Sequence, residues 1–222
     1  MVSAILFDFN GVIIDDEPQH CAALIATLAE DGVTLDRETY YREYLGFDDR
    51  ECFRFTFERL GRPLDDRGLA AAIERKHGHY ARLVRSDFRL VPGAAEFIES
   101  AALEAYQLAV VSGALRREIE LVLDLAGLTP HFAAVVAAED VTACKPDPGG
   151  YLKALQALDL PPSRAVVIED SLPGVAAAHA AGMRCAMLAT SHAEADCAGA
   201  GADAVWPDLV GRTAADLPWA HV

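Results

Sequence analysis

The chain has 222 residues, 52% hydrophobic and 24% charged, so it can bury a sizeable core. Its formal net charge of −15 repels nucleic-acid backbones and anionic membrane surfaces, and we expect neither as a partner. Its five cysteines lack C-x-x-C spacing, which argues against a disulfide framework and a zinc site. No apolar stretch approaches the roughly 20 residues of a membrane span, so we expect a cytoplasmic globular protein.

The first apolar run, residues 3–9, is separated from the later ones by a long segment of different character. Residues 17–90 show helical periodicity and no convincing strand. Val91-Pro92-Gly93 then gives a turn signal that marks the return of the chain. These observations predict a helical domain at 17–90, inserted into a core domain made of residues 1–16 and 91–222.

Beyond this turn, short apolar runs alternate with helix-length segments. The runs are rich in Val, Ile and Ala and have the continuous character of strands buried on both faces. Their alternation with helices predicts an α/β fold, a parallel sheet covered by helices, with Gly127 ending one helix and Ser171 capping another. We expect strands at 3–9, 107–113, 133–139, 164–170 and 184–190, and helices at 93–105, 115–127, 148–160 and 172–182.

Four of the expected strands end at, or are soon followed by, a reactive or phosphate-binding group. Each group alone has an ordinary reading as a turn, a helix cap or a surface loop. The carboxyl ends of strands in an open parallel sheet line one edge, however, so all four groups are expected at a single ligand site. They are, in chain order, Asp8 with Asn10, Ser112 with Gly113, Lys145, and Glu169 with Asp170.

Together these groups suit the transfer of a phosphoryl group. Asp8, Glu169 and Asp170, with a backbone carbonyl, offer the oxygen ligands that Mg²⁺ prefers. Lys145 supplies a positive charge to the nucleophile and the transferring oxygens, while the Ser112 hydroxyl and nearby backbone N–H groups hold the other phosphate oxygens. Asp8 then acts as a carboxylate nucleophile and forms an aspartyl-phosphate intermediate.

The order and spacing of these groups resemble the four motifs of the haloacid dehalogenase-like hydrolase superfamily, in the branch with a helical cap after the first strand. Residues 15–20 and the turn at 91–93 are further similar to the phosphoglycolate phosphatase and β-phosphoglucomutase-like group. The resemblance covers nearly the whole chain and implies a Rossmann-like core, a mobile cap that closes over the substrate, and Mg²⁺-dependent phosphoryl transfer to Asp8. The matching segments are 8–12, 111–113, 145–148 and 168–175.

The resemblance also implies roles for individual residues. In the cap, residues 45–50 are similar to a loop that contacts substrate, and in the family the position of Asn10 binds the metal through its backbone carbonyl. The implied catalytic residues are Asp8, Asn10, Ser112 and Lys145; the implied Mg²⁺ ligands are Asp8, Asn10, Glu169 and Asp170; the implied substrate contacts are Gly11, Ser112, Gly113, Ala114, Lys145, Gly46 and Arg50.

Asn10 departs from the family pattern, because phosphatases and phosphomutases of this superfamily usually carry a second aspartate there. That aspartate protonates the leaving oxygen and then activates water. An amide cannot shuttle a proton, and acid–base catalysis typically contributes about 10² to 10⁴-fold. We expect slow turnover of alkyl phosphates unless a nearby group substitutes, and Asn10 is compatible either with a native residue or with a substitution that traps a complex. The nearby candidates are Asp15, Asp16, Glu17 and His20.

The expected activity is that of a Mg²⁺-dependent phosphatase, monomeric or weakly dimeric, acting on a small phosphorylated metabolite such as a sugar phosphate. A phosphomutase is an alternative, but Leu45 and Asp49 stand where the mutase has basic residues. A phosphate-binding or regulatory protein that has lost catalysis through Asn10 is another. Dehalogenation conflicts with the metal site, and phosphonate cleavage needs a cap lysine, whereas the cap's one lysine, Lys76, lies in a charged segment expected to face solvent.

Overall fold

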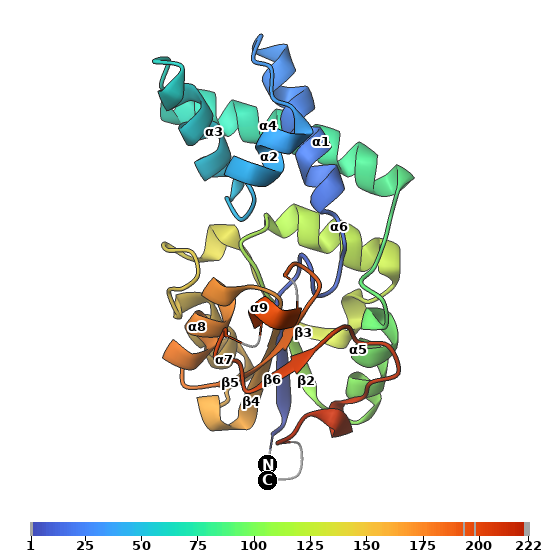
Figure 1. Ribbon diagram of the computed structural model, residues 1–222. Helices are drawn as coiled ribbons and strands as arrows, with labels where there is room; N and C mark the ends of the chain where they lie inside the picture. The colour runs from blue at the N-terminus through green and yellow to red at the C-terminus, as the bar shows by residue number, and fades with distance from the viewer. Residues whose placement is uncertain (1, 193, 198, 220–222) are drawn as a thin grey trace. The chain divides into compact units, whose positions relative to one another are not determined.

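The computed structural model describes residues 2–192, 194–197 and 199–219. The chain forms two compact units, Met1–Asp15 with Arg89–Val222 (the core unit) and Asp16–Phe88 (the helical unit), which are both visible in Figure 1. These boundaries lie within two residues of the expected ones. Within the described ranges, no helix combines the length and the apolar character that crossing a membrane requires.

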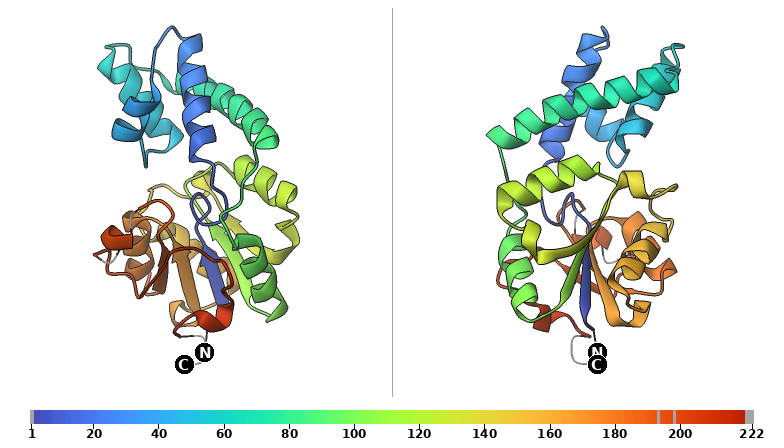
Figure 2. Two further views of the ribbon diagram at one scale, coloured as in Figure 1. Left: turned by 45° about the vertical axis from the view of Figure 1, so that its right-hand side comes forward. Right: turned by 180° about the vertical axis from the view of Figure 1, so that it is seen from behind.

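The core unit is an α/β structure with a parallel sheet. Among the described residues the strand order is β3-β2-β1-β4-β5-β6, and helices lie on both faces of the sheet (Figure 2). This arrangement confirms the predicted Rossmann-like fold. The strands are β1 (Ala4–Phe7), β2 (Gln107–Val111), β3 (Phe132–Val136), β4 (Ala165–Glu169), β5 (Arg184–Leu188) and β6 (Ala204–Trp206); the helices are α5 (Ala94–Leu103), α6 (Arg116–Ala126), α7 (Gly149–Leu158), α8 (Leu172–Ala180) and α9 (Glu194–Cys197).

β1 lies in the middle of this sheet and is buried on both faces. Ala4 and Leu6 belong to an apolar cluster that contains Tyr151 of α7. On the opposite face Phe7 packs edge-on against Phe97 of α5, with ring centroids 6.1 Å apart. Because successive side chains of a strand point to opposite faces, covering both faces requires an apolar residue at every position. This explains the continuous apolar run in the sequence.

The register of the sheet brings the predicted chemical groups to one edge. Phe7 of β1 pairs with Val110 of β2 and with Ile168 of β4. Parallel neighbours in register end at the same level, so the residues that follow each of them emerge together at the carboxyl edge. These following residues are Asp8, Val111 and Glu169.

Among the described strands and α-helices of the core unit, two escaped prediction because their sequence signals are short. β6 has three residues and α9 four, too few to show a period. In the segment expected to be helical, α2 (Arg37–Glu43) has seven residues, only one of which is buried. In addition, the strand expected at 133–139 ends at Val136 and continues as a 3₁₀ turn, Ala138–Asp140.

The helical unit contains no strand in residues 16–88, all of which the structure describes, so the inserted segment is helical as expected. Its other helices are α1 (Glu17–Glu30), α3 (Asp49–Arg59) and α4 (Asp66–Ser86). Three of its helices begin at an aspartate whose carboxylate accepts a backbone N–H of the first turn, which satisfies a donor that the helix leaves unpaired. The three capping residues are Asp36, Asp48 and Asp65.

Gly93, at the return point of the chain, is required by both conformation and space. Its φ is +82°, and a Cβ atom there would lie 2.2 Å from the backbone carbonyl carbon of Leu209. Leu209 also donates its N–H to the carbonyl of Pro92 at 3.3 Å. Two segments far apart in the sequence therefore meet at this glycine.

We predict that Gly93→Ala destabilises the protein by more than about 2 kcal/mol, because it adds a backbone clash to the cost of positive φ. Gly127→Ala is the matched control: Gly127 has φ of +71° and no atom within 4 Å of its added Cβ. It should lose only about 1 to 2 kcal/mol from conformation. Urea unfolding of both variants measures the difference, and equal losses would contradict the role of the close contact.

Candidate active site

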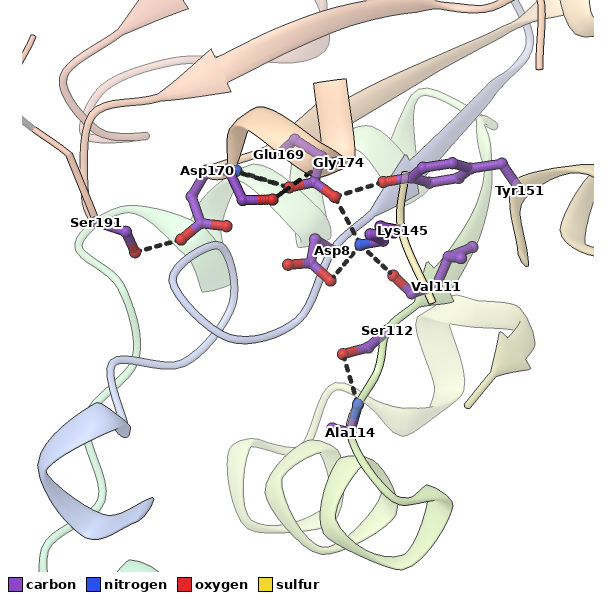
Figure 3. Close-up of polar contacts among 11 residues, drawn as sticks. Asp8, Val111, Ser112, Ala114, Lys145, Tyr151, Glu169, Asp170, Gly174 and Ser191 are labelled. Atoms are coloured by element: carbon purple, nitrogen blue, oxygen red, sulfur yellow. Dashed lines mark hydrogen bonds and ion pairs between the residues drawn. The ribbon is translucent and has the colours of Figure 1, made fainter. Parts of the chain in front are cut away.

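Lys145 connects the ends of three strands. Its Nζ donates to Asp8 Oδ1 at 2.7 Å, to Glu169 Oε1 at 2.6 Å and to the carbonyl of Val111 at 3.1 Å (Figure 3). These acceptors follow or end β1, β4 and β2, and Ser112 lies beside them. The groups that the sequence places at four different strand ends thus meet at one edge of the sheet.

Glu169 uses both of its carboxylate oxygens within the protein. Oε1 accepts from Lys145 and from the Tyr151 hydroxyl, the latter at 2.7 Å. Oε2 accepts from the backbone N–H groups of Asp170 and Ser171 at 3.1 and 3.2 Å, and from the Ser171 hydroxyl at 3.0 Å. Glu169 is fully buried, so these five bonds replace its hydration. Its geometry therefore suits a residue that holds Lys145 in place.

Asp8, Glu169 and Asp170 can each offer a carboxylate oxygen, all within 4.8 Å of one another. With all three carboxyl groups ionised, Lys145 would compensate one negative charge and leave an excess of about two in a buried region. The donors are all oxygens, the type that Mg²⁺ and similar hard cations prefer. Charge, donor type and spacing therefore fit a divalent cation.

The pKa values of these groups reflect the same shortage of positive charge. Burial raises the pKa of Asp8 to about 6, although Lys145 opposes the rise. Burial, with the nearby charges of Asp8 and Glu169, holds the pKa of Asp170 well above its usual range. Burial disfavours charge on Glu169 and Lys145 too, but the attraction between opposite charges prevails. Lys145 lowers the pKa of Glu169, and Asp8 and Glu169 raise the pKa of Lys145.

The loop after β2 carries the predicted phosphate contacts. Ser112 is 6% exposed, and its Oγ accepts the backbone N–H of Ala114 at 3.1 Å. The Ala114 N–H is thus used to order the loop, while the Ser112 hydroxyl keeps its own hydrogen to donate. Gly113 between them is exposed. Their contact with phosphate stays a prediction.

Gly11 and Gly174 allow the loops of the site to approach closely. A Cβ on Gly11, where φ is +73°, would lie 2.0 Å from Asp170 Oδ2. A Cβ on Gly174 would lie 1.9 Å from Glu169 Cδ. The close approach at Gly174 brings the N-terminus of α8, capped by Ser171 as predicted, against the Glu169 carboxylate. The N-terminus of a helix carries a partial positive charge, which stabilises such a carboxylate.

Asn10 lies in the loop that follows Asp8, where Gly11 N–H donates to the carbonyl of Ile14 at 2.8 Å. Four nearby residues were expected as possible replacements for the acid–base group that Asn10 lacks, and the structure places them as follows. Asp15 is exposed in the core unit, whereas the other three belong to the helical unit and are engaged there. Asp16 accepts from Tyr80 and lies 3.3 Å from His20 Nε2, and Glu17 accepts from Tyr40 at 2.5 Å.

The expectation that Lys76 faces solvent is wrong. Its side chain is 3% exposed, and its Nζ donates to Asp49 and lies 2.9 Å from His20 Nδ1. Lys76 belongs to the inward stripe of α4, whose spacing of three and four residues was visible in the sequence. Its ion pair still disfavours phosphonate chemistry, because an amine attacks only in its uncharged form. The buried residues of that stripe are Leu69, Ala72, Lys76, Tyr80 and Val84.

Gly46 and Arg50 also belong to the helical unit. Gly46 has φ of +88° in the loop before α3, and Arg50 is exposed in the first turn of that helix. Asp48 caps the helix and forms a capping box with Glu51. The roles of Gly46 and Arg50 as substrate contacts therefore stay predictions.

Sequence reasoning missed three polar residues of the site. Tyr151 lies on the buried side of α7, and its hydroxyl reaches Glu169. Thr190 and Ser191 follow β5; their hydroxyls donate to the carbonyl of Gly11 and to Asp170, respectively. The rule that found the other groups, a polar residue just beyond a parallel strand, applies equally to Thr190 and Ser191.

Comparison with known proteins agrees with this geometry. Residues 2–182 match the model of the haloacid dehalogenase-like hydrolases. The chain belongs to this family. It is 31% identical to the validoxylamine A 7'-phosphate phosphatase of Streptomyces hygroscopicus subsp. limoneus, over 100% of this chain and 99% of that protein. It is also 31% identical to the phosphorylated carbohydrates phosphatase of Thermotoga maritima, with 82% of each covered.

Among solved structures, the family member CbbY from Rhodobacter sphaeroides is similar along nearly its whole length. An Asp-to-Asn mutant of that protein, in complex with xylulose-(1,5)bisphosphate, has a TM-score of 0.84 and 31% sequence identity to this chain. The similarity covers 97% of this chain and 98% of that one. The folds of the core unit and the helical unit are therefore both shared with that protein, over 97% of this chain.

We predict that Gly174→Ala destabilises the protein by more than about 2 kcal/mol, because its Cβ forces the Glu169 carboxylate away from Lys145 and Tyr151. The control is Gly78→Ala in α4, where the added Cβ has no neighbour within 4 Å. That substitution should gain about 0.5 to 1 kcal/mol from helix propensity. Thermal unfolding compares the two, and a neutral Gly174→Ala would refute the close packing of α8 on Glu169.

Proposed function

We propose that this hydrolase is a Mg²⁺-dependent phosphatase that acts on a small phosphorylated metabolite of the sugar-phosphate class. The observation that carries the proposal is the contact of Lys145 with Asp8 and Glu169, beside Asp170. The relative named as a phosphorylated carbohydrates phosphatase supports the substrate class, and the validoxylamine A 7'-phosphate phosphatase supports a phosphorylated small molecule. The family's hydrolytic chemistry supports the reaction type.

The residues present divide into cation ligands and a group that positions Lys145. Asp8, Asp170 and the backbone carbonyl of Asn10 are the direct ligands in this proposal. Glu169 would act beside them without direct ligation, because each of its oxygens already accepts at least two hydrogen bonds. When bound, Mg²⁺ would balance the remaining negative charge and polarise the phosphate oxygens.

The nucleophile in the proposed reaction is Asp8. With a pKa of about 6 it is ionised at neutral pH, and Lys145 holds one of its oxygens. The carboxylate attacks phosphorus, a bond forms between the Asp8 oxygen and phosphorus, and the bond to the ester oxygen breaks. The leaving alkoxide takes a proton from water, because the Asn10 amide has none to transfer. Water then attacks phosphorus and gives a proton to the hydroxide left by the first step, so that inorganic phosphate is released and the Asp8 carboxylate is restored.

The test is phosphate release from a panel of sugar phosphates and related monoesters. We expect release that stops when the cation is chelated and returns with added Mg²⁺. Asp8→Asn is the control that removes the nucleophile and should abolish release while leaving the protein folded. The absence of release from every ester, with and without Mg²⁺, would overturn the proposed activity.

Asn10 favours a second candidate, a protein that binds a phosphorylated ligand without turning it over. The solved Asp-to-Asn mutant of CbbY holds a sugar bisphosphate, so an Asp-to-Asn change in a relative is compatible with ligand binding. Titration calorimetry with the same esters and Mg²⁺ separates the candidates. Binding without any phosphate release supports the second, and steady release supports the first.

We predict that Asn10→Asp raises the rate of phosphate release from alkyl phosphates by about 10² to 10⁴-fold, because the carboxyl group can protonate the leaving oxygen and then activate water. Steady-state assays at saturating Mg²⁺ measure the change. Asn10→Ala is the matched control and should show no gain, since it preserves the backbone carbonyl but supplies no acid. An unchanged or lower rate in Asn10→Asp would show that this position does not limit catalysis.

A further inference from the structure

The loop after β5 contacts both of the loops that carry the proposed cation ligands. The Thr190 hydroxyl donates to the carbonyl of Gly11 at 2.6 Å. The Ser191 hydroxyl donates to Asp170 Oδ2 (Figure 3). Gly11 follows Asn10 in the loop after β1, and Asp170 follows β4. Two consecutive hydroxyls therefore connect three strand ends.

Gly11 lies close to both of the other loops. A Cβ on Gly11 would lie 2.0 Å from Asp170 Oδ2 and 2.8 Å from Ser191 Oγ. A shift of the β5 loop would therefore move the hydroxyl partners of both other loops. Asp170 is 5% exposed, so protein groups rather than bulk water set the direction of its carboxylate.

We propose that Thr190 and Ser191 are positioning residues that set the separation between the loop bearing Asp8 and Asn10 and the carboxylate of Asp170, and thereby the affinity for the divalent cation. The proposal rests on the proposed function, because that function supplies the cation. Neither residue lies in the four motifs recognised in the sequence.

The choice of hydroxyl groups has an electrostatic reason. A neutral donor orients a carboxylate without cancelling its charge, whereas an ammonium group at the same place would compete with the cation. Ser191 occupies one oxygen of Asp170 and leaves the charge of the carboxylate for the metal. Thr190 acts through the backbone, since its bond to the Gly11 carbonyl restrains the peptide next to Asn10. Partners of this kind typically change metal affinity by about 10 to 100-fold.

The test is Mg²⁺ binding by titration calorimetry, with Mn²⁺ binding followed by electron paramagnetic resonance. We expect Ser191→Ala and Thr190→Val each to weaken cation binding by about 10-fold or more. Ser191→Thr and Thr190→Ser keep the hydroxyl and should bind nearly as the unaltered protein does. Ser163→Ala, which removes an exposed hydroxyl elsewhere in the core unit, should have no effect.

Melting temperatures of the cation-free variants complete the test. Weaker binding at an unchanged melting temperature supports positioning, and phosphate assays should then show a higher Mg²⁺ requirement with kcat largely restored at saturation. Unchanged affinity in both hydroxyl-deleted variants overturns the inference, as does a loss of affinity matched by a loss of folding in all four variants. If the unaltered protein binds no divalent cation, the Mg²⁺ dependence in the proposed function is wrong instead.

Discussion

Mutual repulsion among Asp8, Glu169 and Asp170 is the constraint on which the rest of the core unit depends. The register of β1 against β4 places these acids at one buried edge, where water cannot screen them. Lys145 compensates part of the charge, and Tyr151 and the start of α8 hydrogen-bond Glu169. The remaining imbalance makes this edge suitable for a cation and for the phosphate that a cation attracts.

Consecutive acids at the end of β4 have different tasks because their partners differ. Glu169 is surrounded by donors from the protein and is bound on both oxygens. Asp170 is oriented by the Ser191 hydroxyl, a neutral donor that does not compensate its charge. The first acid thus stabilises the position of Lys145, and the second faces the site. Two neighbouring residues thus serve the structure of the core unit and the candidate active site, respectively.

Strand ends were the most informative feature of the sequence, since a parallel sheet brings them together whatever lies between them. That rule predicted the meeting of Asp8, Lys145 and Glu169. It could not show that Glu169 is saturated by hydrogen bonds, because this depends on Tyr151 and on the approach of α8 at Gly174. Lys76 was expected to face solvent because its neighbours in the sequence are charged. Its helical spacing instead places it on the buried face of α4.

Asn10 separates two functions that an aspartate at this place would combine. In the proposed function the backbone carbonyl, available to either residue, would bind the cation, whereas only an acidic side chain could transfer a proton. The packing of Gly11 against Asp170 constrains the backbone of this loop independently of the Asn10 side chain. Geometry for binding phosphate can therefore persist while the rate of ester cleavage falls. In such a site, affinity and turnover are set by different atoms of the same residue.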